Sequence, residues 1–375
     1  MEQSAATAKR QVIQVVSGFR PDVDGMGDYA RHLAEEMWRQ SGAESEIVVL
    51  RRPRNGGEAG SRVGWRVIYA DSATGEGLSG LLRERMRAMP EARVLLHYGP
   101  YAYTSDGLPL RFAREICELG AGERLAVFFH EMWAHGWPWR RAFWTRGNQM
   151  RAVRALLASA RMGFSSSGMY LSWLEGMNDA ATPLRQVRIF SNMGELERPL
   201  PLSERERQLV VFGQRETRVG FYRQYGGRLA RLCRILGLDR IVDVGSGVSA
   251  GIPARIGDLP VERAGFLSEG DASALMATSV AGVVRYWPDK WEKSGVLASY
   301  QAHGMVPLIA RRGMEGFRAF EAMPFALVGD VLRRREAMSA SEMQTLADRG
   351  HEFYRREVAL ARAAERVIAG LADGK

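Results

Sequence analysis

Short apolar runs alternate with longer amphipathic stretches along this chain of 375 residues. The runs are rich in Val, Ile, Leu and Phe, and the stretches between them carry apolar residues at helical spacing. This alternation is typical of parallel α/β architecture, in which each strand is followed by a helix that returns the chain to the same edge of the sheet. The sequence therefore predicts an α/β fold, and its length favours two domains.

The first half of the chain is predicted to alternate strands with helices. Strands are expected at Gln11–Val16, Ser45–Leu50, Trp65–Tyr69, Ala92–Tyr98, Arg124–His130, Met162–Ser165 and Val187–Phe190. Helices are expected at Gly27–Ser41, Leu108–Leu119 and Gln149–Ala160. The first of these helices repeats apolar residues at Tyr29, Leu33 and Met37, the spacing of one buried helical face.

The same order restarts after Glu195–Glu206, a charged stretch with two prolines that is predicted to be a linker between domains. The elements expected next are a strand at Gln208–Phe212, a helix at Arg218–Leu236, and strands at Arg240–Val244, Val261–Gly265, Gly282–Tyr286 and Val306–Ile309. Ser339 to Leu371 forms one strong helical pattern with an N-cap at Ser339 or Ser341. Two successive parallel units imply a cleft, and such sheets bind ligands at the carboxyl ends of their strands.

The formal net charge of +9 suits anionic partners such as nucleotide phosphates or anionic lipid head groups. No zinc-knuckle, RNP or helix-turn-helix pattern favours nucleic acid. The two cysteines, Cys117 and Cys233, lack metal-ligand spacing and are expected to be buried free thiols. The first ten residues are polar, and no run approaches the roughly 18 apolar residues that span a bilayer, so a cytoplasmic location is expected.

A glycine turn, Gly25-Met26-Gly27, leads into the first predicted helix. The N-terminus of a helix presents backbone N–H groups and the positive end of the helix dipole, so a phosphate or a sugar hydroxyl can bind there. Ala30 stands where the third glycine of a dinucleotide motif would be, so a dinucleotide site is not indicated. A plain strand-to-helix turn is the alternative interpretation.

Two further predicted strands of the first half carry a histidine at or next to their last residue. His97 is followed by Tyr98 and Tyr101, whose rings and hydroxyls suit the face of a sugar, although a packed aromatic loop is the alternative. His130 is followed by Glu131, and a histidine beside a carboxylate can act as hydrogen-bond donor or as acid and base. Neighbouring residues on a strand point to opposite faces, so this pair need not touch, and a structural histidine is the alternative.

Aromatic and basic residues concentrate between Trp133 and Arg161. The segment holds Trp133, Trp137, Trp139 and Trp144 together with Arg140, Arg141, Arg146, Arg151, Arg154 and Arg161. Tryptophan with arginine suits a membrane interface or a lipid-pyrophosphate acceptor. An ordinary docking loop followed by a surface helix is the alternative.

The second half offers two motifs at predicted strand ends. Arg215 and Arg218 follow the strand Gln208–Phe212, where arginine can clamp a diphosphate, although a solvated helix start is the alternative. Gly245-Ser246-Gly247 is similar to the glycine motif of S-adenosylmethionine-dependent methyltransferases. In that fold the strand is normally the first of its sheet and an acid ends the next strand; neither holds here, so a methyltransferase is the weaker alternative.

The most specific motif lies around Lys293-Ser294-Gly295, which follows a predicted strand and opens a helix that ends at Ala302-His303-Gly304. The N-terminus of that helix is a ready anion site, to which Lys293 adds a charge. Both internal lysines of this arginine-rich chain, Lys290 and Lys293, fall in the loop. A plain loop and a packing helix are the alternative.

In their order along the chain, these motifs resemble retaining GT-B glycosyltransferases of the family-4-like group, also called glycosyltransferase group 1. Gly25–Ala30 looks like their N-terminal glycine loop, and His130-Glu131 like the strand end whose histidine faces the sugar donor. Ser191–Glu195 looks like their link between domains. Gly213–Arg218 looks like their basic phosphate clamp, and Ser294–Pro307 like their donor-binding loop and helix.

The resemblance covers nearly the whole chain and implies two Rossmann-like domains that face each other across a cleft. It implies an acceptor-side domain in residues 1–195, a donor domain in 196–340, and a C-terminal helix in 341–375 that packs back on the first domain. The catalytic residues that it implies are His130, Glu292 and Lys293. The donor-binding residues would be Gly25, Met26, Gly27, Arg215, Arg218, Ser294, Gly295 and Val296, and the acceptor-side residues His97, Tyr98, Tyr101 and Glu131.

The activity implied is the metal-independent transfer of a sugar, hexosyltransferase-like, from a nucleotide-diphosphate sugar to a glycan, lipid-linked or small-molecule acceptor. The setting implied is bacterial surface polysaccharide or glycoconjugate synthesis. The donor is a substrate, and no cofactor is expected. The partners expected are the donor, the acceptor and, at the periphery, an anionic membrane.

One departure from the family concerns its two glutamates, which lie eight residues apart in the last motif. The matching positions here are Trp291 and Ser299, with Glu292 one residue from the first. The second glutamate usually contacts the ribose of the nucleotide. A non-catalytic GT-B-like protein that binds a sugar nucleotide or a glycan is therefore the alternative function.

Overall fold

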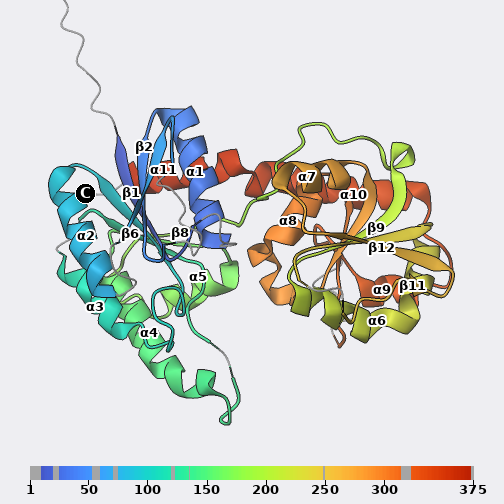
Figure 1. Cartoon of the computed structure of the whole chain (residues 1–375), viewed down its shortest axis with the longest axis horizontal. Helices are drawn as coiled ribbons and strands as arrows, with labels where there is room; N and C mark the ends of the chain where they lie inside the picture. Colours follow the sequence, from blue (N-terminus) through green and yellow to red (C-terminus); the bar gives the residue numbers. More distant parts are fainter. Residues whose placement is uncertain are drawn as a thin grey trace, which may run out of the picture. The chain divides into compact units, whose positions relative to one another are not determined.

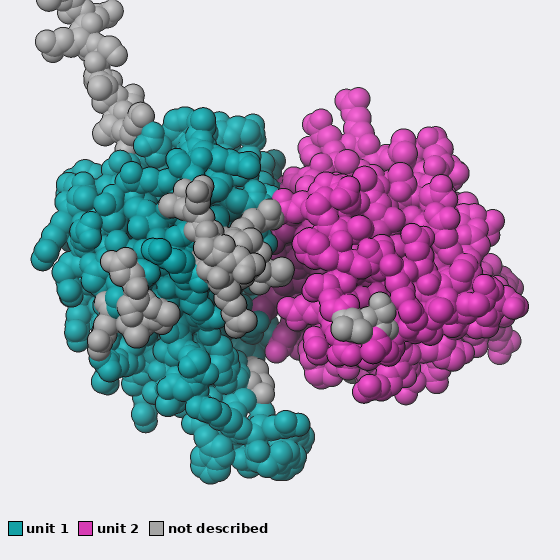
Figure 2. Space-filling view, in the orientation of Figure 1, with its two compact units in different colours: residues 1–188, 360–375 teal, residues 189–359 magenta. Residues whose placement is uncertain are grey.

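The computed structural model describes residues 10–19, 25–52, 60–70, 75–119, 123–134, 136–247, 250–313 and 322–372. It divides into two compact units, which Figures 1 and 2 show. Unit 1 comprises residues 1–188 and 360–375, and unit 2 comprises residues 189–359. Each unit is built on a mainly parallel sheet with helices on both faces, which confirms the predicted α/β class.

The sheet of unit 1 has eight strands in the order β3-β4-β2-β1-β5-β6-β7-β8, parallel except for β3. The strands are β1 (Gln11–Val16), β2 (Glu44–Val49), β3 (Ser61–Arg62), β4 (Trp65–Tyr69), β5 (Arg93–Tyr98), β6 (Leu125–Phe129), β7 (Met162–Ser165) and β8 (Leu184–Gln186). The order reverses between β1 and β5, which is the position where such sheets bind ligands.

Six of the seven strands predicted in the first half are present to within about one residue at each end. The seventh, Val187–Phe190, is wrong because β8 ends at Gln186. Its neighbour β7 ends at Ser165, and the amide of Val187 makes the last bond to that residue, at 2.9 Å. The apolar run that follows has no strand left to pair with, and it carries the chain into unit 2.

Helices cover both faces of the unit 1 sheet. They are α1 (Gly25–Ser41), α2 (Gly75–Ala88), α3 (Leu110–Glu118), α4 (Arg141–Ser159), α5 (Gly168–Glu175) and α11 (Leu360–Ala372). Leu82, Phe112 and Leu156 place α2, α3 and α4 in one core with Ile13 and Val15. The other face carries α1, whose Ala30 and Ala34 pack with Val16, Ile47 and Val49.

Helix α4 begins at Arg141, eight residues before the predicted start at Gln149. Its first turns carry Phe143 and Trp144, whose side chains are exposed. The apolar periodicity that predicts a helix begins only near Ala152, Val153 and Leu156, which are buried in the core, so the predicted start was too late.

The single helix predicted from Ser339 to Leu371 is in fact two helices in two units. Helix α10 (Ala340–Phe353) begins with a capping box made by Ser339 and Glu342, which confirms the first predicted N-cap. A π-helical turn at Tyr354–Val358 and extended backbone at Ala359 end it before α11 begins. Tyr354 is fully buried, and its hydroxyl donates to Glu195 Oε1 at 2.6 Å. This local packing interrupts a pattern that looks continuous in the sequence.

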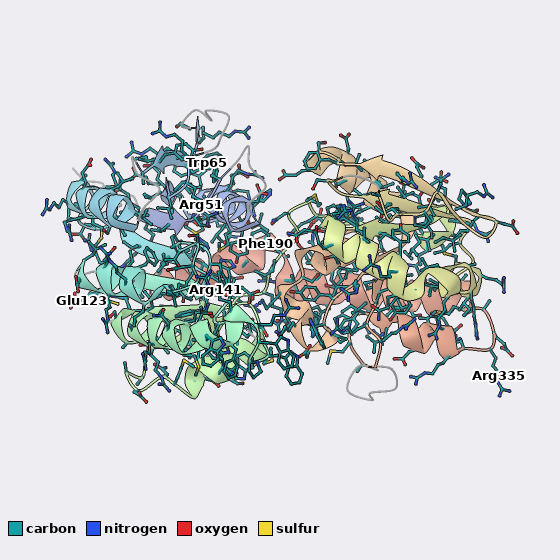
Figure 3. The ribbon with its side chains drawn as sticks, turned by 60° about the horizontal axis from the view of Figure 1, so that its bottom comes forward. Arg51, Trp65, Glu123, Arg141, Phe190 and Arg335 are labelled. Atoms are coloured by element: carbon teal, nitrogen blue, oxygen red, sulfur yellow. The ribbon has the colours of Figure 1, made fainter. Side chains whose placement is uncertain are left out.

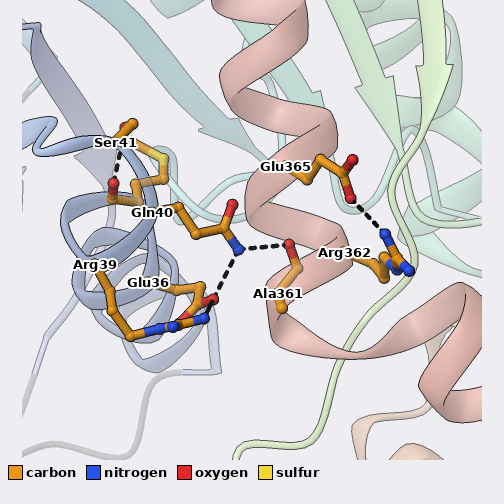
Figure 4. A network of polar contacts seen from close by, with 8 residues as sticks. Glu36, Arg39, Gln40, Ser41, Ala361, Arg362 and Glu365 are labelled. Carbon is orange, nitrogen blue, oxygen red and sulfur yellow. Dashed lines mark hydrogen bonds and ion pairs between the residues drawn. The ribbon is translucent and has the colours of Figure 1, made fainter.

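Helix α10 packs on β14 and α8 in unit 2, and α11 packs on α1 in unit 1. Figure 4 shows the polar contacts of the second pair. Glu36, buried on α1, accepts from Arg39 at 2.8 Å and from Gln40 at 2.7 Å. Gln40 Nε2 also donates to the carbonyl of Ala361 at 2.8 Å, so α11 is fixed to α1 by a side chain that is itself held in place.

The sheet of unit 2 has seven strands in the order β11-β12-β10-β9-β13-β14-β15, parallel except for β11. The strands are β9 (Glu206–Phe212), β10 (Arg240–Val244), β11 (Arg255–Ile256), β12 (Leu259–Gly265), β13 (Ser279–Val284), β14 (Val306–Ile309) and β15 (Ala326–Leu327). The predicted strand at Gly282–Tyr286 starts three residues earlier than expected and ends two residues earlier. The order reverses between β9 and β13.

The helices of unit 2 other than α10 are α6 (Arg215–Ile235), α7 (Glu269–Ala277), α8 (Gly295–Ala302) and α9 (Val328–Arg333). One core holds α6 and α9, and another holds α7 and α8. The stretch Glu195–Glu206, predicted to be a linker, lies within unit 2. The units change at 188/189 and 359/360, whereas the predicted domain boundaries were 195/196 and 340/341. Within the described residues, every helix is too short or too polar to cross a bilayer.

Candidate ligand sites at the carboxyl edges of the two sheets

The candidate residues of unit 1 meet where β5 and β6 end. The Cβ position of Gly99 lies 3.9 Å from Met26 Sδ and 4.0 Å from Glu131 Cβ, so the start of α1 adjoins both strand ends. Gly25 is exposed at this edge, and Gly27 is buried. A Cβ on Gly27 would lie 2.5 Å from the carbonyl oxygen of Gly18, so this glycine permits a close approach of backbone. Residues 20–24 of the motif lie outside the described residues.

A buried polar chain leads to His130. The rings of His97 and His130 face each other, with Nδ1 of His97 2.9 Å from Nε2 of His130. On its other side, His97 Nε2 lies 3.0 Å from Gln14 Oε1, and Gln14 Nε2 donates to Ser45 Oγ at 3.2 Å. Because an amide oxygen only accepts, His97 Nε2 carries a proton.

Burial of the His97 ring lowers its pKa to about 3, so the ring is neutral at pH 7. With its proton on Nε2, its Nδ1 accepts, and His130 Nε2 must donate. A neutral His130 ring therefore carries its acceptor nitrogen at Nδ1. Phe128 stacks on that ring at 4.3 Å between centroids, and Tyr29 meets it edge-on at 5.2 Å. These hydrogen bonds and ring contacts thus fix the orientation of the His130 ring, and the hydrogen bond to His97 fixes the tautomer of its neutral form.

The structure places the other predicted acceptor-side residues differently from one another. His97 lies beneath His130 and has no exposed surface. Tyr98 is also fully buried in the unit 1 core, and burial raises the pKa of its hydroxyl. Tyr101 is partly exposed, with its ring against Gly107. Glu131 is exposed and accepts from the Tyr170 hydroxyl at 2.8 Å. Glu131 and Tyr101 are therefore the members of this set that reach the surface.

In unit 2, the predicted helix start at Ser294-Gly295 and its end at Ala302 are confirmed as α8. Ser294 is the N-cap, and its Oγ accepts from the amide of Leu297 at 3.2 Å. Val296 packs against the apolar core beside it. Glu292 and Lys293 are half-buried in the 3₁₀ turn Pro288–Lys293 that precedes the helix. The sequence thus locates this helix N-terminus correctly.

The guanidinium of Arg218 is bound by other groups of unit 2 and is not available to a ligand. Its guanidinium donates to the carbonyls of Gly213 at 2.9 Å and Ser246 at 2.7 Å, and it forms an ion pair with Asp243. Both side chains of the pair are 2% exposed. Burial raises the pKa of the Asp243 carboxyl, and the charge of Arg218 acts to lower it. Arg218 therefore positions the loops that follow β9 and β10, a role that sequence spacing did not suggest.

Gly245 makes this arrangement possible. A Cβ there would lie 2.2 Å from the carbonyl oxygen of Gly213 and 2.8 Å from Arg218 Nε. The glycine motif after β10 thus has a packing role, and β10 follows β9 in the chain and pairs with it. Arg215 is more open than Arg218, and it donates to the carbonyl of Ala250 at 3.3 Å.

The position where the resembled family has its second glutamate is part of the core. Ser299 is 1% exposed, and its Oγ donates to the carbonyl of Gly295 at 2.8 Å. Ser191 Oγ donates to the same hydroxyl at 3.0 Å. His303 Nδ1 lies 2.7 Å from the carbonyl oxygen of Ser299. A serine at this position fits between neighbours that a carboxylate would displace.

Arginines after two neighbouring strands were missed by sequence reasoning. Arg285 directly follows β13, and Arg311 and Arg312 come soon after β14. Their position at or just after the ends of two predicted strands could have indicated a shared site, because basic residues that follow adjacent parallel strands lie at the same edge of the sheet.

Comparisons with known proteins agree on the fold. No family model and no curated protein matches the chain. Among solved structures, WaaG, "a glycosyltransferase involved in lipopolysaccharide biosynthesis", is 12% identical with a TM-score of 0.63, covering 97% of this chain and 100% of that one. A structure described as trehalose-6-phosphate from E. coli bound with UDP-2-fluoro glucose is 12% identical with a TM-score of 0.62, covering 96% and 98%.

A third structure carries a different activity in its description. The putative UDP-N-acetylglucosamine 2-epimerase from Listeria monocytogenes is 14% identical with a TM-score of 0.61, covering 97% of this chain and 96% of that one. The chain therefore has the GT-B fold, of the kind found in glycosyltransferase group 1. Identities this low establish the fold alone, because one fold can support different reactions through different site residues.

Proposed function

We propose that this chain is a glycosyltransferase that takes its sugar from a nucleotide-diphosphate donor. The observation that carries the proposal is the likeness of nearly the whole chain to GT-B structures, one of which is described as holding UDP-2-fluoro glucose. Two helices of unit 2, α6 and α8, also begin at the reversal of the sheet, after β9 and β13. Helix starts at that edge suit the phosphates of a donor.

The chemical task in such a transfer is to stabilise the negative charge that develops on the departing diphosphate. Lys293 and the N–H groups at the start of α8 are proposed to supply part of the positive charge, with Arg215 beside the start of α6. Glu292 belongs to the same turn. Side chains and helix termini would supply the positive charge that a metal ion supplies in other transferases, so the proposed reaction is metal-independent. We further propose that the sugar transferred is a hexose. No cofactor is included in the proposal.

His130 is proposed to contact the transferred sugar. Its Nε2 donates to His97, which fixes the orientation of the ring at the end of β6, next to Glu131. The acceptor substrate is proposed to be a glycan, a lipid-linked sugar or a small molecule near Glu131 and Tyr101 in unit 1. A role in bacterial surface polysaccharide or glycoconjugate synthesis is consistent with the description of WaaG.

Contact with an anionic membrane at the start of α4 is part of the same proposal. Trp137 is 68% exposed and Trp139 is 74% exposed, and their rings stack at 5.3 Å. Trp144 is also exposed, and Arg141, labelled in Figure 3, begins the helix beside them. Residues 132–174 contain no aspartate or glutamate. Exposed tryptophan with unopposed arginine suits the head-group region of an anionic bilayer.

The transfer is tested by incubating the protein with a panel of sugar nucleotides and measuring nucleotide release with and without candidate acceptors. Release that falls by two orders of magnitude or more in both Lys293→Ala and His130→Ala would support the proposal. Nucleotide binding without release from any donor would favour the alternative, a non-catalytic GT-B-like binding protein. The buried Ser299, in place of a glutamate, is the observation that favours that alternative.

The membrane contact is tested by sedimentation with vesicles. The protein should pellet with vesicles of phosphatidylcholine and phosphatidylglycerol but not with phosphatidylcholine alone. The double substitution Trp137→Ala and Trp139→Ala should remove most of this binding. Phe266→Ala, which removes a 70% exposed ring from unit 2, is the control and should leave binding unchanged. Equal binding by the double variant would refute the contact.

A further inference from the structure

Three arginines gather at the carboxyl edge of the unit 2 sheet. Strands β13 and β14 are neighbours, with Val284 opposite Ile309, and the amide of Ala310 donates to the carbonyl of Val284 at 2.8 Å. Arg285 follows the end of β13 directly, and Arg311 and Arg312 follow the end of β14. The end of this sheet therefore collects three guanidinium groups, none of which sequence reasoning had assigned to a ligand.

The partners of these arginines are neutral. Arg285 Nε donates to Gln224 Oε1 at 3.1 Å, and Arg312 Nη2 donates to the backbone carbonyl of the same glutamine at 2.5 Å. The guanidinium of Arg311 stacks on Trp287, with Cζ 3.1 Å from the ring centroid. Over the described part of the chain, none of the three approaches a carboxylate to within 4.0 Å. Arg218 of the same unit differs, because it is buried against the carboxylate of Asp243.

The charges also oppose one another. The pKa of Arg311 is lowered, first by burial and then by the positive charge of Arg285, and Asp289 acts in the opposite direction. Two like charges that are held close without a paired acid raise the free energy of the unliganded site. An anion between them would relieve that repulsion.

Gly220 on α6 gives Arg285 its room. A Cβ at this position would lie 3.3 Å from Cζ, Nε and Nη1 of Arg285 alike, so the guanidinium lies across the helix backbone. Contacts of that length are tighter than a methyl group normally makes, and any side chain at Gly220 would push the guanidinium away. Arg285 thus supplies the charge, and the absence of a side chain at Gly220 leaves space for its guanidinium against α6.

We propose that Arg285, Arg311 and Arg312 form a binding site for a phosphate-bearing anion. Arginine pairs with phosphate oxygens through two parallel N–H groups, and three such groups converge at an edge where sheets of this kind bind ligands. The diphosphate of the donor is the anion expected if the proposed function holds, and to that extent the identity of the ligand rests on it. The site itself requires only phosphate chemistry.

This site changes the expected source of positive charge in unit 2. Arg218, predicted from the sequence to clamp the diphosphate, is 2% exposed and paired with Asp243. Its charge is already neutralised, so it has little to offer an anion. Arg285 and Arg311 carry charge that no neighbouring carboxylate neutralises by direct contact, and they supply what Arg218 does not.

Binding of pyrophosphate, UDP and inorganic phosphate to the full chain, measured by isothermal titration calorimetry, tests the site. Arg285→Gln and Arg311→Gln should each weaken pyrophosphate binding by roughly 10- to 100-fold, the usual loss for a hydrogen bond to a charged group. Gly220→Ala removes no charge and should still weaken binding several-fold, because it displaces Arg285. Arg335→Gln is the control for net charge, since Arg335 is an exposed arginine of the same unit (Figure 3).

The outcomes separate this site from the proposed function. Unchanged pyrophosphate binding in Arg285→Gln and Arg311→Gln, with the variants folded by circular dichroism, would overturn the site. So would a loss no greater than that in Arg335→Gln. If the protein transfers sugar and the two variants keep both pyrophosphate binding and the KM for the donor, the function stands and the site fails. If pyrophosphate binding is lost in the variants while no donor is ever turned over, the site stands and the function fails.

Discussion

The Arg218–Asp243 pair allows a quantitative test of how unit 2 is held together. Asp243→Asn keeps the shape of the side chain and removes its charge. Arg218 would then keep its bonds to the carbonyls of Gly213 and Ser246 but would be a buried cation without a counter-ion. Breaking a buried pair in this way typically costs about 3–5 kcal/mol of unfolding free energy. We expect the lower part of that range, because the two carbonyl bonds remain.

The expected loss becomes a shift in denaturation midpoint. For a unit of this size the dependence of unfolding free energy on urea is about 2 kcal/mol per molar. A cost of about 3–4 kcal/mol therefore lowers the midpoint of unit 2 by roughly 1.5–2 M. Unit 1 contains neither residue, so its own midpoint should not move.

The two cysteines report the two units separately. Cys233 lies on α6 in unit 2 and is buried, which raises the pKa of its thiol to about 12 and makes it unreactive while folded. Cys117 lies on α3 in unit 1, and burial raises the pKa of its thiol as well. A pulse of iodoacetamide at increasing urea, followed by mass spectrometry of the two peptides, gives one unfolding curve for each unit.

Asp330→Asn is the matched control in the same unit. Asp330 is paired with Arg333, but the two side chains are 38% and 55% exposed, so the expected cost is at most about 1 kcal/mol. The reasoning fails if the Cys233 midpoint falls no further in Asp243→Asn than in Asp330→Asn. It also fails if the Cys117 midpoint falls equally, because the effect would then not belong to unit 2.

Two further changes can be followed at the same two cysteines, with a pyridyl disulfide, which reacts with thiols at acid pH, in place of iodoacetamide. The pKa of His97 is about 3 when folded and about 6.5 when unfolded, so unit 1 should lose about 2 kcal/mol of unfolding free energy between pH 7.5 and pH 5, because the unfolded histidine takes up a proton that the folded one does not. His97→Asn should flatten that dependence at Cys117, and an unchanged pH profile would contradict the buried neutral ring. Gly282→Ala would put a Cβ 2.4 Å from the Tyr300 ring and should cost about 1–3 kcal/mol in unit 2. Gly226→Ala on α6, with nothing within 4 Å, should stabilise that unit by about 0.5–1 kcal/mol, and equal effects of the two changes would contradict the packing argument.

Sequence patterns predicted the sheets well because most of their strands are buried on both faces and read as continuous apolar runs. The predictions were wrong where apolar residues lie outside a strand or are exposed on a helix. Val187–Phe190 is apolar but has no strand to pair with, and the first turns of α4 expose their aromatic rings. At Tyr354, a buried side chain interrupts a helical pattern that gives no sign of a break.

The candidate site was predictable in its backbone but not in its pairings. Ser294-Gly295 was recognised as a helix start, and Gly25-Met26-Gly27 as a turn into a helix that begins at Gly25, two residues before the predicted start at Gly27, because glycine and serine signal such positions locally. That His97 lies beneath His130 depends on the register of β5 and β6, in which His97 stands opposite Phe128. That Arg218 meets Asp243 depends on two elements 25 residues apart. Neither distance can be read from spacing along one strand.

The return of α11 to unit 1 has a consequence for the order in which the chain folds during synthesis. Unit 2 is one continuous segment, whereas unit 1 waits for Leu360–Ala372. At 5–20 residues per second, the ribosome needs roughly 10–35 s to make the intervening stretch of about 170 residues. Until then the face of α1 that meets Ala361, and Phe164 beneath Gly370, have no cover. All residues of unit 2 are therefore synthesised before the last helix of unit 1. A nascent chain stalled within unit 2 would expose the surface of unit 1 that α11 normally covers, and chaperones could bind there.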